Sequence, residues 1–93
     1  MTQVNVKMAP EDISLIERLF YEYNASRDLV SYLMQQDRIN ENYLQQYINI
    51  TEKRFVELEM HKDLMDRQYR PEGLDPVNYT FDFVNEQLIY DVE

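Results

Sequence analysis

Two long stretches of this chain repeat apolar residues at steps of three and four, and one short interruption separates them. The stretches cover residues 10–36 and 40–70. This period puts the apolar side chains on one stripe of an α-helix, which needs another element to cover it. The interruption around residues 37–40 is only about four residues long, a length typical of antiparallel neighbours. The pattern therefore predicts a hairpin of two long helices lying side by side.

Both predicted helices carry start and stop signals. Pro10 and the two carboxylates after it suit the first turn of a helix, where proline is tolerated and negative charge meets the positive end of the dipole. Asn40 is a candidate N-cap for the second helix. Pro71 and Gly73 end that helix, because proline disfavours helical geometry in the residue before it and glycine permits a turn.

The two ends of the chain alternate apolar and polar residues, which indicates half-buried β-strands. We predict a strand over residues 1–8 and a β-hairpin over residues 77–92. A third helix beginning at residues 75–76 is the alternative, but strict alternation and aromatic content favour strands. Because the first helix starts where the second ends, the strands meet there in a three-stranded antiparallel sheet. The predicted fold class is α+β, a long antiparallel helical hairpin with a small sheet at its open end.

The alternation also predicts how the two strands of the terminal hairpin pair. If Asn85 and Glu86 form the turn, Phe83 faces Leu88 and the apolar side chains of both strands share one face. The other predicted pairs are Phe81 with Tyr90 and Tyr79 with Val92. A four-residue loop in the same register is an alternative, because Asn-Glu is not a preferred turn pair.

Length and charge limit the classes of protein to consider. A chain of 93 residues makes one domain, residues 1–93, because it is too short to build two cores. With 18 acidic and 9 basic residues its net charge is −9, which disfavours direct binding to nucleic acid or to anionic membranes. The sequence has no cysteine, no signal-peptide pattern and no apolar run of the ~20 residues that a membrane span needs. A cytoplasmic protein is expected.

Residues that most catalytic sites need are scarce in this sequence. Gly73 is the only glycine, which excludes phosphate-binding glycine loops. His61 is the only histidine, and its charged neighbours favour a solvated side chain. No apolar pattern surrounds a carboxylate in a way that would raise its pKa for acid-base work. We therefore expect a protein that is not an enzyme and that uses no cofactor and no metal ion.

Surface features remain as candidate partner-binding sites. The first helix carries apolar side chains over a wider arc than one partner helix covers, and Tyr21, Tyr32 and Tyr43 are expected to lie partly outside the seam. Tyrosine is enriched in interfaces because it combines contact area with a polar tip. The alternative is that the tyrosines cap a thin core. A free sheet edge offers a second docking mode for a peptide strand, and the apolar arc is compatible with a homodimer.

Glu59, Asp63 and Asp66 form a predicted acidic stripe on the second helix. This stripe supports an alternative function, an acidic inhibitor of phage or mobile-element origin that imitates nucleic acid and occupies a basic groove. The simpler interpretation is a solvated face, on which Asp63 pairs with Arg67 and Asp66 pairs with Arg70 four residues on. A small enzyme subunit with a composite active site is the third hypothesis and ranks last.

The order of the elements resembles that of a known group of proteins. The resemblance is carried by the segments IERLFYEYNASRDLVSYL, YLQQYINITEKRFVELEMHKDLMDRQY and YTFDFVNEQLIYDVE. These are similar to small bacterial accessory proteins encoded beside radical-SAM maturases of ribosomally made peptides with regular cysteine repeats. The resemblance implies a non-catalytic partner that presents or recruits a precursor peptide. The leading hypothesis is a protein or peptide interaction module, an accessory or adaptor subunit of a larger bacterial complex.

Overall fold

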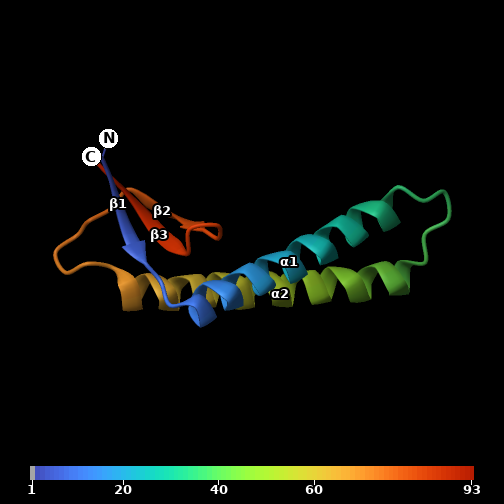
Figure 1. Ribbon diagram of the computed structural model, residues 1–93. Coiled ribbons are helices and arrows are strands. Elements are labelled where there is room, and N and C mark those ends of the chain that lie inside the picture. Colours follow the sequence, from blue (N-terminus) through green and yellow to red (C-terminus); the bar gives the residue numbers. More distant parts are fainter. Residues whose placement is uncertain (1) are drawn as a thin grey trace.

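A hairpin of two helices with a three-stranded antiparallel sheet at one end makes up the molecule, as the computed structural model of residues 2–93 shows (Figure 1). The elements in chain order are β1 Thr2–Lys7, α1 Pro10–Met34, α2 Glu41–Tyr69, β2 Asn78–Asp82 and β3 Gln87–Val92. The predicted α+β fold is confirmed. Met1, the first residue of the predicted N-terminal strand, lies outside the described residues.

The two helices begin and end close to their sequence signals. The Asn40 side chain accepts a hydrogen bond of 3.1 Å from the Tyr43 N–H, as an N-cap does. After α2, Arg70 has extended backbone geometry, which the following proline imposes, and Gly73 turns the chain with a φ of 82°. The connection between the helices spans residues 35–40, which is longer than predicted because α1 ends at Met34. Within residues 2–93, neither helix combines the length and the apolar content that a membrane span requires.

The strand order in the sheet is β1-β3-β2, so the last strand of the chain lies in the centre. The predicted register of the terminal hairpin is wrong by two residues: Phe81, not Phe83, pairs with Leu88, and Tyr79 pairs with Tyr90. The turn is not Asn85-Glu86 but a four-residue loop, residues 83–86, that shifts the pairing. Because side chains alternate with a period of two, this shift leaves each paired side chain on its predicted face.

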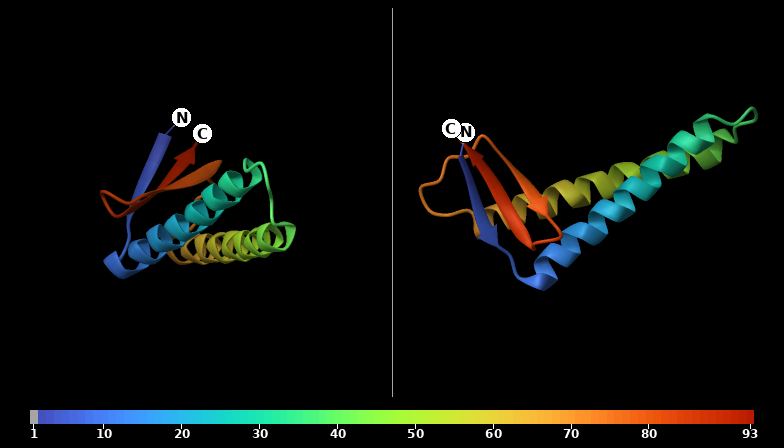
Figure 2. Two further views of the ribbon diagram at one scale, coloured as in Figure 1. Left: turned by 90° about the vertical axis from the view of Figure 1, so that its right-hand side faces the viewer. Right: turned by 45° about the horizontal axis from the view of Figure 1, so that its top comes forward.

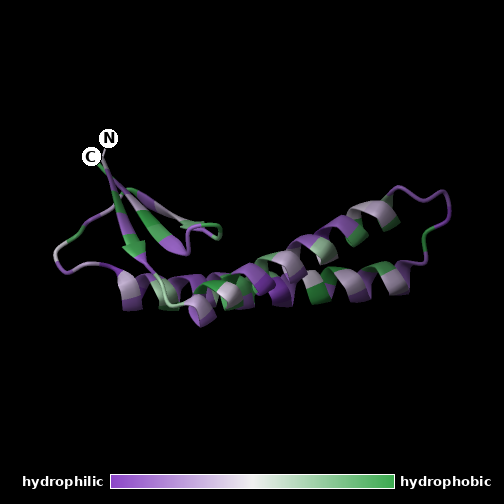
Figure 3. Ribbon diagram, viewed as in Figure 1, coloured by the Kyte–Doolittle hydropathy of each residue, from purple (hydrophilic) through white to green (hydrophobic). Residues whose placement is uncertain are grey.

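The hydrophobic core lies where the sheet covers the helices, at one end of the molecule. Its buried residues are Met8, Ile13, Ile16, Met65, Leu88 and Tyr90. Tyr69 closes the junction between β1 and α1, since its hydroxyl accepts a hydrogen bond of 3.0 Å from the Ala9 N–H and donates one to the Asp12 carboxylate. Beyond the sheet the hairpin continues as two bare helices (Figures 2 and 3), on which apolar residues are still frequent.

Candidate functional site

β2 is an edge strand that lies across the hairpin and faces its far end. The strand order leaves β1 and β2 at the two edges, and β2 is the strand nearer the middle of the hairpin (Figures 1 and 2). One end of β2 lies above α2, and the other leads to Phe83, whose ring packs against Phe20 of α1 with centroids 6.1 Å apart. The free edge of the sheet thus spans both helices.

The hydrogen-bond pattern of the sheet identifies the backbone groups on this edge. Opposite residues in an antiparallel pair alternate between those that exchange backbone hydrogen bonds and those that do not. Met8 stands opposite Glu86 and donates its N–H to the Glu86 carbonyl over 2.9 Å, so β3 bonds β1 through its even-numbered residues. Its odd-numbered residues then bond β2 through residues 78, 80 and 82. The alternation therefore directs the backbone groups of Tyr79 and Phe81 toward the free edge.

A small cavity of about 200 Å³ lies beneath this edge, between β2 and the two helices. Its lining residues are Ile16, Phe20, Lys62, Tyr79, Thr80, Phe81 and Phe83. Tyr79 and Phe81 point toward the helices, with their rings packed edge to face at 5.8 Å, and both stay half-buried. We call the cavity, together with the outward backbone of Tyr79 and Phe81, the β2-edge groove. It combines unfilled apolar space with an open strand edge.

Negative charge lies along the α2 side of the groove. Burial raises the pKa of the Tyr79 phenol, and the negative charges of Asp66, Glu59 and Asp63 raise it further. Glu59 and Asp63 remain exposed, although each has a basic neighbour on the same helix. Lys62 lies 3.1 Å from Glu59, and Arg67 lies 2.8 Å from Asp63. The rim of the groove is therefore acidic but partly neutralised.

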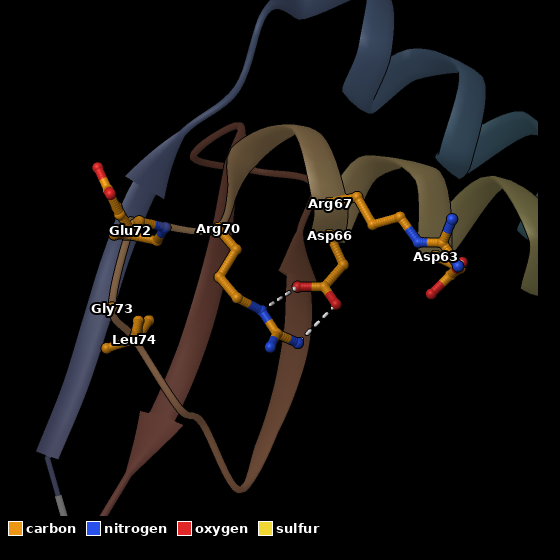
Figure 4. Close-up of a pocket in the computed structure, with 8 residues that line it drawn as sticks. Asp63, Asp66, Arg67, Arg70, Glu72, Gly73 and Leu74 are labelled. Carbon is orange, nitrogen blue, oxygen red and sulfur yellow. Dashed lines mark hydrogen bonds and ion pairs between the residues drawn. The ribbon is translucent and has the colours of Figure 1, made fainter.

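The structure places Asp66 apart from the exposed stripe to which the sequence pattern assigned it. Asp66 faces β3 and is buried, because its position on α2 lies directly under the sheet. Its carboxylate accepts two hydrogen bonds from Arg70, at 3.0 and 2.7 Å (Figure 4). It also accepts one of 2.9 Å from the Tyr90 hydroxyl. The predicted pairs of Asp63 with Arg67 and of Asp66 with Arg70 are both present. Asp66 holds the fold together and has no free face for a partner.

In the pocket at the end of α2, the charged side chains are also neutralised by ion pairs within the helix. It lies between the last turns of α2 and the loop around Gly73, and its charged side chains include Asp63, Arg67 and Arg70 (Figure 4). Each arginine already binds a carboxylate one turn earlier, so the charges do not converge on a ligand. Among residues 2–93, no group of three or more metal-ligating side chains is placed to hold an ion.

The three predicted tyrosines lie outside the helix seam, as expected. Tyr21 is 72% exposed, Tyr32 61% and Tyr43 50%. Tyr21 and Tyr32 are three turns apart and share the outer face of α1, whereas Tyr43 belongs to α2 and packs against Tyr47 with ring centroids 5.1 Å apart. None of the three lines the groove. Their role in partner binding stays a prediction.

The sequence patterns predicted a free sheet edge but not the cavity beneath it, because the cavity depends on the strand order. In the sequence, Phe20 belongs to the apolar arc of the first helix, and Phe81 and Phe83 belong to the shared apolar face of the terminal hairpin. No local pattern marks the cavity, because long-range pairing sets the strand order that leaves β2 at an edge. No protein-family model, curated protein or solved structure matches this chain.

Proposed function

We propose that this chain is a non-catalytic module that binds a protein or peptide partner by accepting an extended segment along the free edge of β2. One observation carries the proposal: Tyr79 and Phe81 offer outward backbone groups and also line an apolar cavity. Added strands gain affinity from main-chain hydrogen bonds and specificity from pockets that take alternate side chains. Both elements of that recognition mode are supplied here by the same two residues.

The size of the cavity supports a peptide rather than a small molecule as the ligand. Its volume of about 200 Å³ is below the range of roughly 300–1,000 Å³ typical of small-molecule pockets. A single aliphatic or aromatic side chain from a strand paired with β2 would point into it. The rings of Phe20 and Phe83 would form one wall, and the alkyl part of Lys62 another.

The charge distribution favours a basic segment. Residues 24–57 contain five acidic and four basic residues, which leaves thirteen acidic and five basic residues in the rest of the chain. Almost all of the net charge of −9 therefore lies at the end that carries the sheet and the groove. Such a potential steers cationic partners to the site and disfavours acidic ones.

We further propose that the chain acts as an accessory or adaptor subunit of a bacterial cytoplasmic complex, and binding of an extended segment suits such a role. The resemblance to accessory proteins of peptide-modification systems supports a precursor peptide as the extended segment. A module of this kind would hold the peptide while an associated enzyme acts on it, without contributing catalytic groups of its own.

The test begins with selection of displayed random peptides on the immobilised protein. One selected peptide is then synthesised, labelled and titrated against four proteins: wild type, Phe20→Ser, Phe81→Ser and Tyr21→Ser. Tyr21 is the matched control, because it adjoins Phe20 in sequence but lies on the outer face of α1. Loss of the groove side chains should weaken binding by about tenfold or more, the effect of roughly 1.4 kcal/mol. Tyr21→Ser should bind like wild type.

Backbone amide shifts provide a second readout that does not depend on the variants. Addition of the peptide should shift the amide resonances of Tyr79 and Phe81 more than those of Gln3 and Asn5 on the opposite edge strand. Equal binding by wild type and Phe20→Ser, combined with loss of binding in Tyr21→Ser, would overturn the proposal and favour the tyrosine face of α1. Circular dichroism of each variant confirms that the helices are intact.

A further inference from the structure

The far part of the hairpin has no core of its own. Within residues 24–57, all of which the structure describes, no apolar side chain is fully buried; the nearest buried ones are Leu19 and Leu58. Large apolar residues in this part are exposed instead: Tyr32, Met34, Ile39, Tyr43, Ile50, Phe55 and Val56. A helix buries its apolar stripe only against a further layer, and here the sheet no longer covers the pair (Figure 3).

Where the bare hairpin begins, one side of it is closed by polar contacts. Arg54 of α2 reaches across to α1, where its guanidinium donates to the Glu22 carbonyl over 3.1 Å and also to the Ser26 hydroxyl. The Ser26 hydroxyl in turn donates to the Glu22 carbonyl over 3.0 Å. Ser26 is buried although it is polar, because this bridge covers it.

The other side of the bare hairpin is open and apolar. Tyr23 lies two turns after Ile16 and Phe55 lies two turns before Lys62, so both belong to the side of the hairpin that the sheet covers nearer its base. Their rings meet across the seam with centroids 5.5 Å apart. Arg54 immediately precedes Phe55 and therefore lies about 100° round α2, on the closed side.

We define the distal face as the residues that continue this open side toward the hairpin tip. Its members are Tyr23, Val30, Met34, Ile48 and Phe55, which follow helical spacings of four, seven and eleven residues. Met34 and Phe55 are exposed, and the other three are half-buried. The face is therefore an unfinished layer of a helical bundle.

We propose that a second copy of this chain covers the distal face in an antiparallel, two-fold symmetric arrangement of four helices. The charge distribution supports this occupant. Residues 24–57 carry a net charge of −1, whereas the remainder carries −8. Two distal halves meet with little repulsion, and the antiparallel order places the two strongly acidic sheet ends at opposite ends of the dimer. Four helices then enclose the apolar layer that two leave open.

Sedimentation of variants at micromolar concentrations tests this dimer. The wild type should sediment as a dimer, with twice the monomer mass of 11.4 kDa. Met34→Glu and Phe55→Glu should sediment as monomers, because two-fold symmetry places each new charge in the interface twice. Tyr21→Glu, which introduces the same charge on the exposed outer face of α1, should stay dimeric. A wild type that remains monomeric, or a Tyr21→Glu variant that dissociates as readily as the others, overturns the proposal.

Cross-linking tests the relative direction of the two copies. The chain lacks cysteine, so single cysteines can be introduced without background. In the antiparallel order Tyr23→Cys of one copy lies near Met34→Cys of the other, and a mixture of the two variants should form a mixed disulfide dimer on oxidation. Preferential cross-linking of Met34→Cys with itself would overturn the antiparallel order. Phe81→Ser should remain dimeric, so failure of the dimer and failure of the groove are separate outcomes.

Discussion

The hydroxyl of Tyr90 donates a hydrogen bond of 2.9 Å to the Asp66 carboxylate, and this bond ties the central strand to the last turns of α2. The Tyr90 ring is fully buried, and the Arg70 guanidinium lies 5.9 Å from its centroid. Because β2 pairs with β3, this contact also fixes the distance between the free edge of β2 and the helices. The geometry of the groove therefore depends on a polar contact in the core.

Removal of the Tyr90 hydroxyl or of the Asp66 carboxylate should destabilise the fold, and the two losses should differ in size. Tyr90→Phe should lower the free energy of unfolding by about 1 kcal/mol, because one hydrogen bond is lost and Arg70 still satisfies the carboxylate. Asp66→Ala should cost more, about 2–3 kcal/mol, because it also deprives the buried Tyr90 hydroxyl of its best acceptor. Urea unfolding measures both values.

Asp63→Ala is the matched control for Asp66→Ala. Asp63 is exposed and also pairs with an arginine four residues later, so its removal should change the free energy of unfolding by about 0.5 kcal/mol or less. Equal losses from the two alanine variants would show that the Tyr90 contact contributes nothing beyond the ion pair.

The same contact makes the protein sensitive to alkaline pH. Burial and the hydrogen bond to Asp66 raise the pKa of Tyr90 above its ordinary value of about 10, and the hydrogen bond to Asp12 raises that of Tyr69. Above about pH 10 the unfolded chain loses these protons while the folded chain keeps them, so stability falls as pH rises. Each group contributes at most about 1.4 kcal/mol per pH unit.

Urea unfolding at neutral pH and above pH 10 measures this loss. The slope of stability against pH should be smaller in Tyr90→Phe than in the wild type. Tyr21→Phe, which removes an exposed phenol, should keep the slope of the wild type. An unchanged slope in Tyr90→Phe would contradict the conclusion that the raised pKa of Tyr90 contributes to the loss of stability at alkaline pH.

Much of the architecture could be predicted from local patterns. The helical period and the Asn40 cap located both helices, and the period of two located the strands, because these signals lie within a few residues of the element that they define. The pairing register was predicted wrongly, because the alternation of side chains fits more than one register and the hydrogen bonds of Asp82 decide between them. The Asp82 carboxylate accepts hydrogen bonds of 3.1 Å from the N–H groups of Val84 and Asn85, which favours a loop of four residues.

The candidate site was less predictable, because long-range contacts decide it. Asp63 and Asp66 look equivalent in the sequence, yet β3 covers only Asp66. Phe20 and Tyr21 are adjacent aromatic residues on one helix, and only the placement of Phe83 gives Phe20 a neighbour across the cavity. Both outcomes follow from the central position of β3, which no local pattern in the chain specifies.

The turn at Glu86 should be improvable by mutation. Glu86 has a φ of 55°, in the left-handed region that costs most side chains about 1 kcal/mol. Glu86→Gly should therefore raise the free energy of unfolding by up to about 1 kcal/mol, less what the unfolded chain gains in entropy. Gly73→Ala should lower the free energy of unfolding, because Gly73 has a φ of 82°. An added Cβ would meet no atom within 4 Å, so any loss of stability comes from backbone strain. Thermal unfolding of the two variants provides the comparison, and shifts of the same sign would contradict it.

Salt dependence should separate the charge and the apolar parts of peptide binding. Glu59 and Asp63 are exposed at the acidic rim, so raising the salt concentration to about 0.5 M should weaken binding of a basic peptide without abolishing it. The double variant Glu59→Gln, Asp63→Asn should bind more weakly at low salt and show a flatter salt dependence. Phe81→Ser should bind more weakly at every salt concentration with an unchanged slope, because burial of an apolar side chain is not screened by ions. Two outcomes would contradict this prediction: high salt eliminates binding by the wild type, or Phe81→Ser binds as well as the wild type. Either outcome would mean that the carboxylates and not the groove dominate recognition. An acidic mimic of nucleic acid would then be the better explanation.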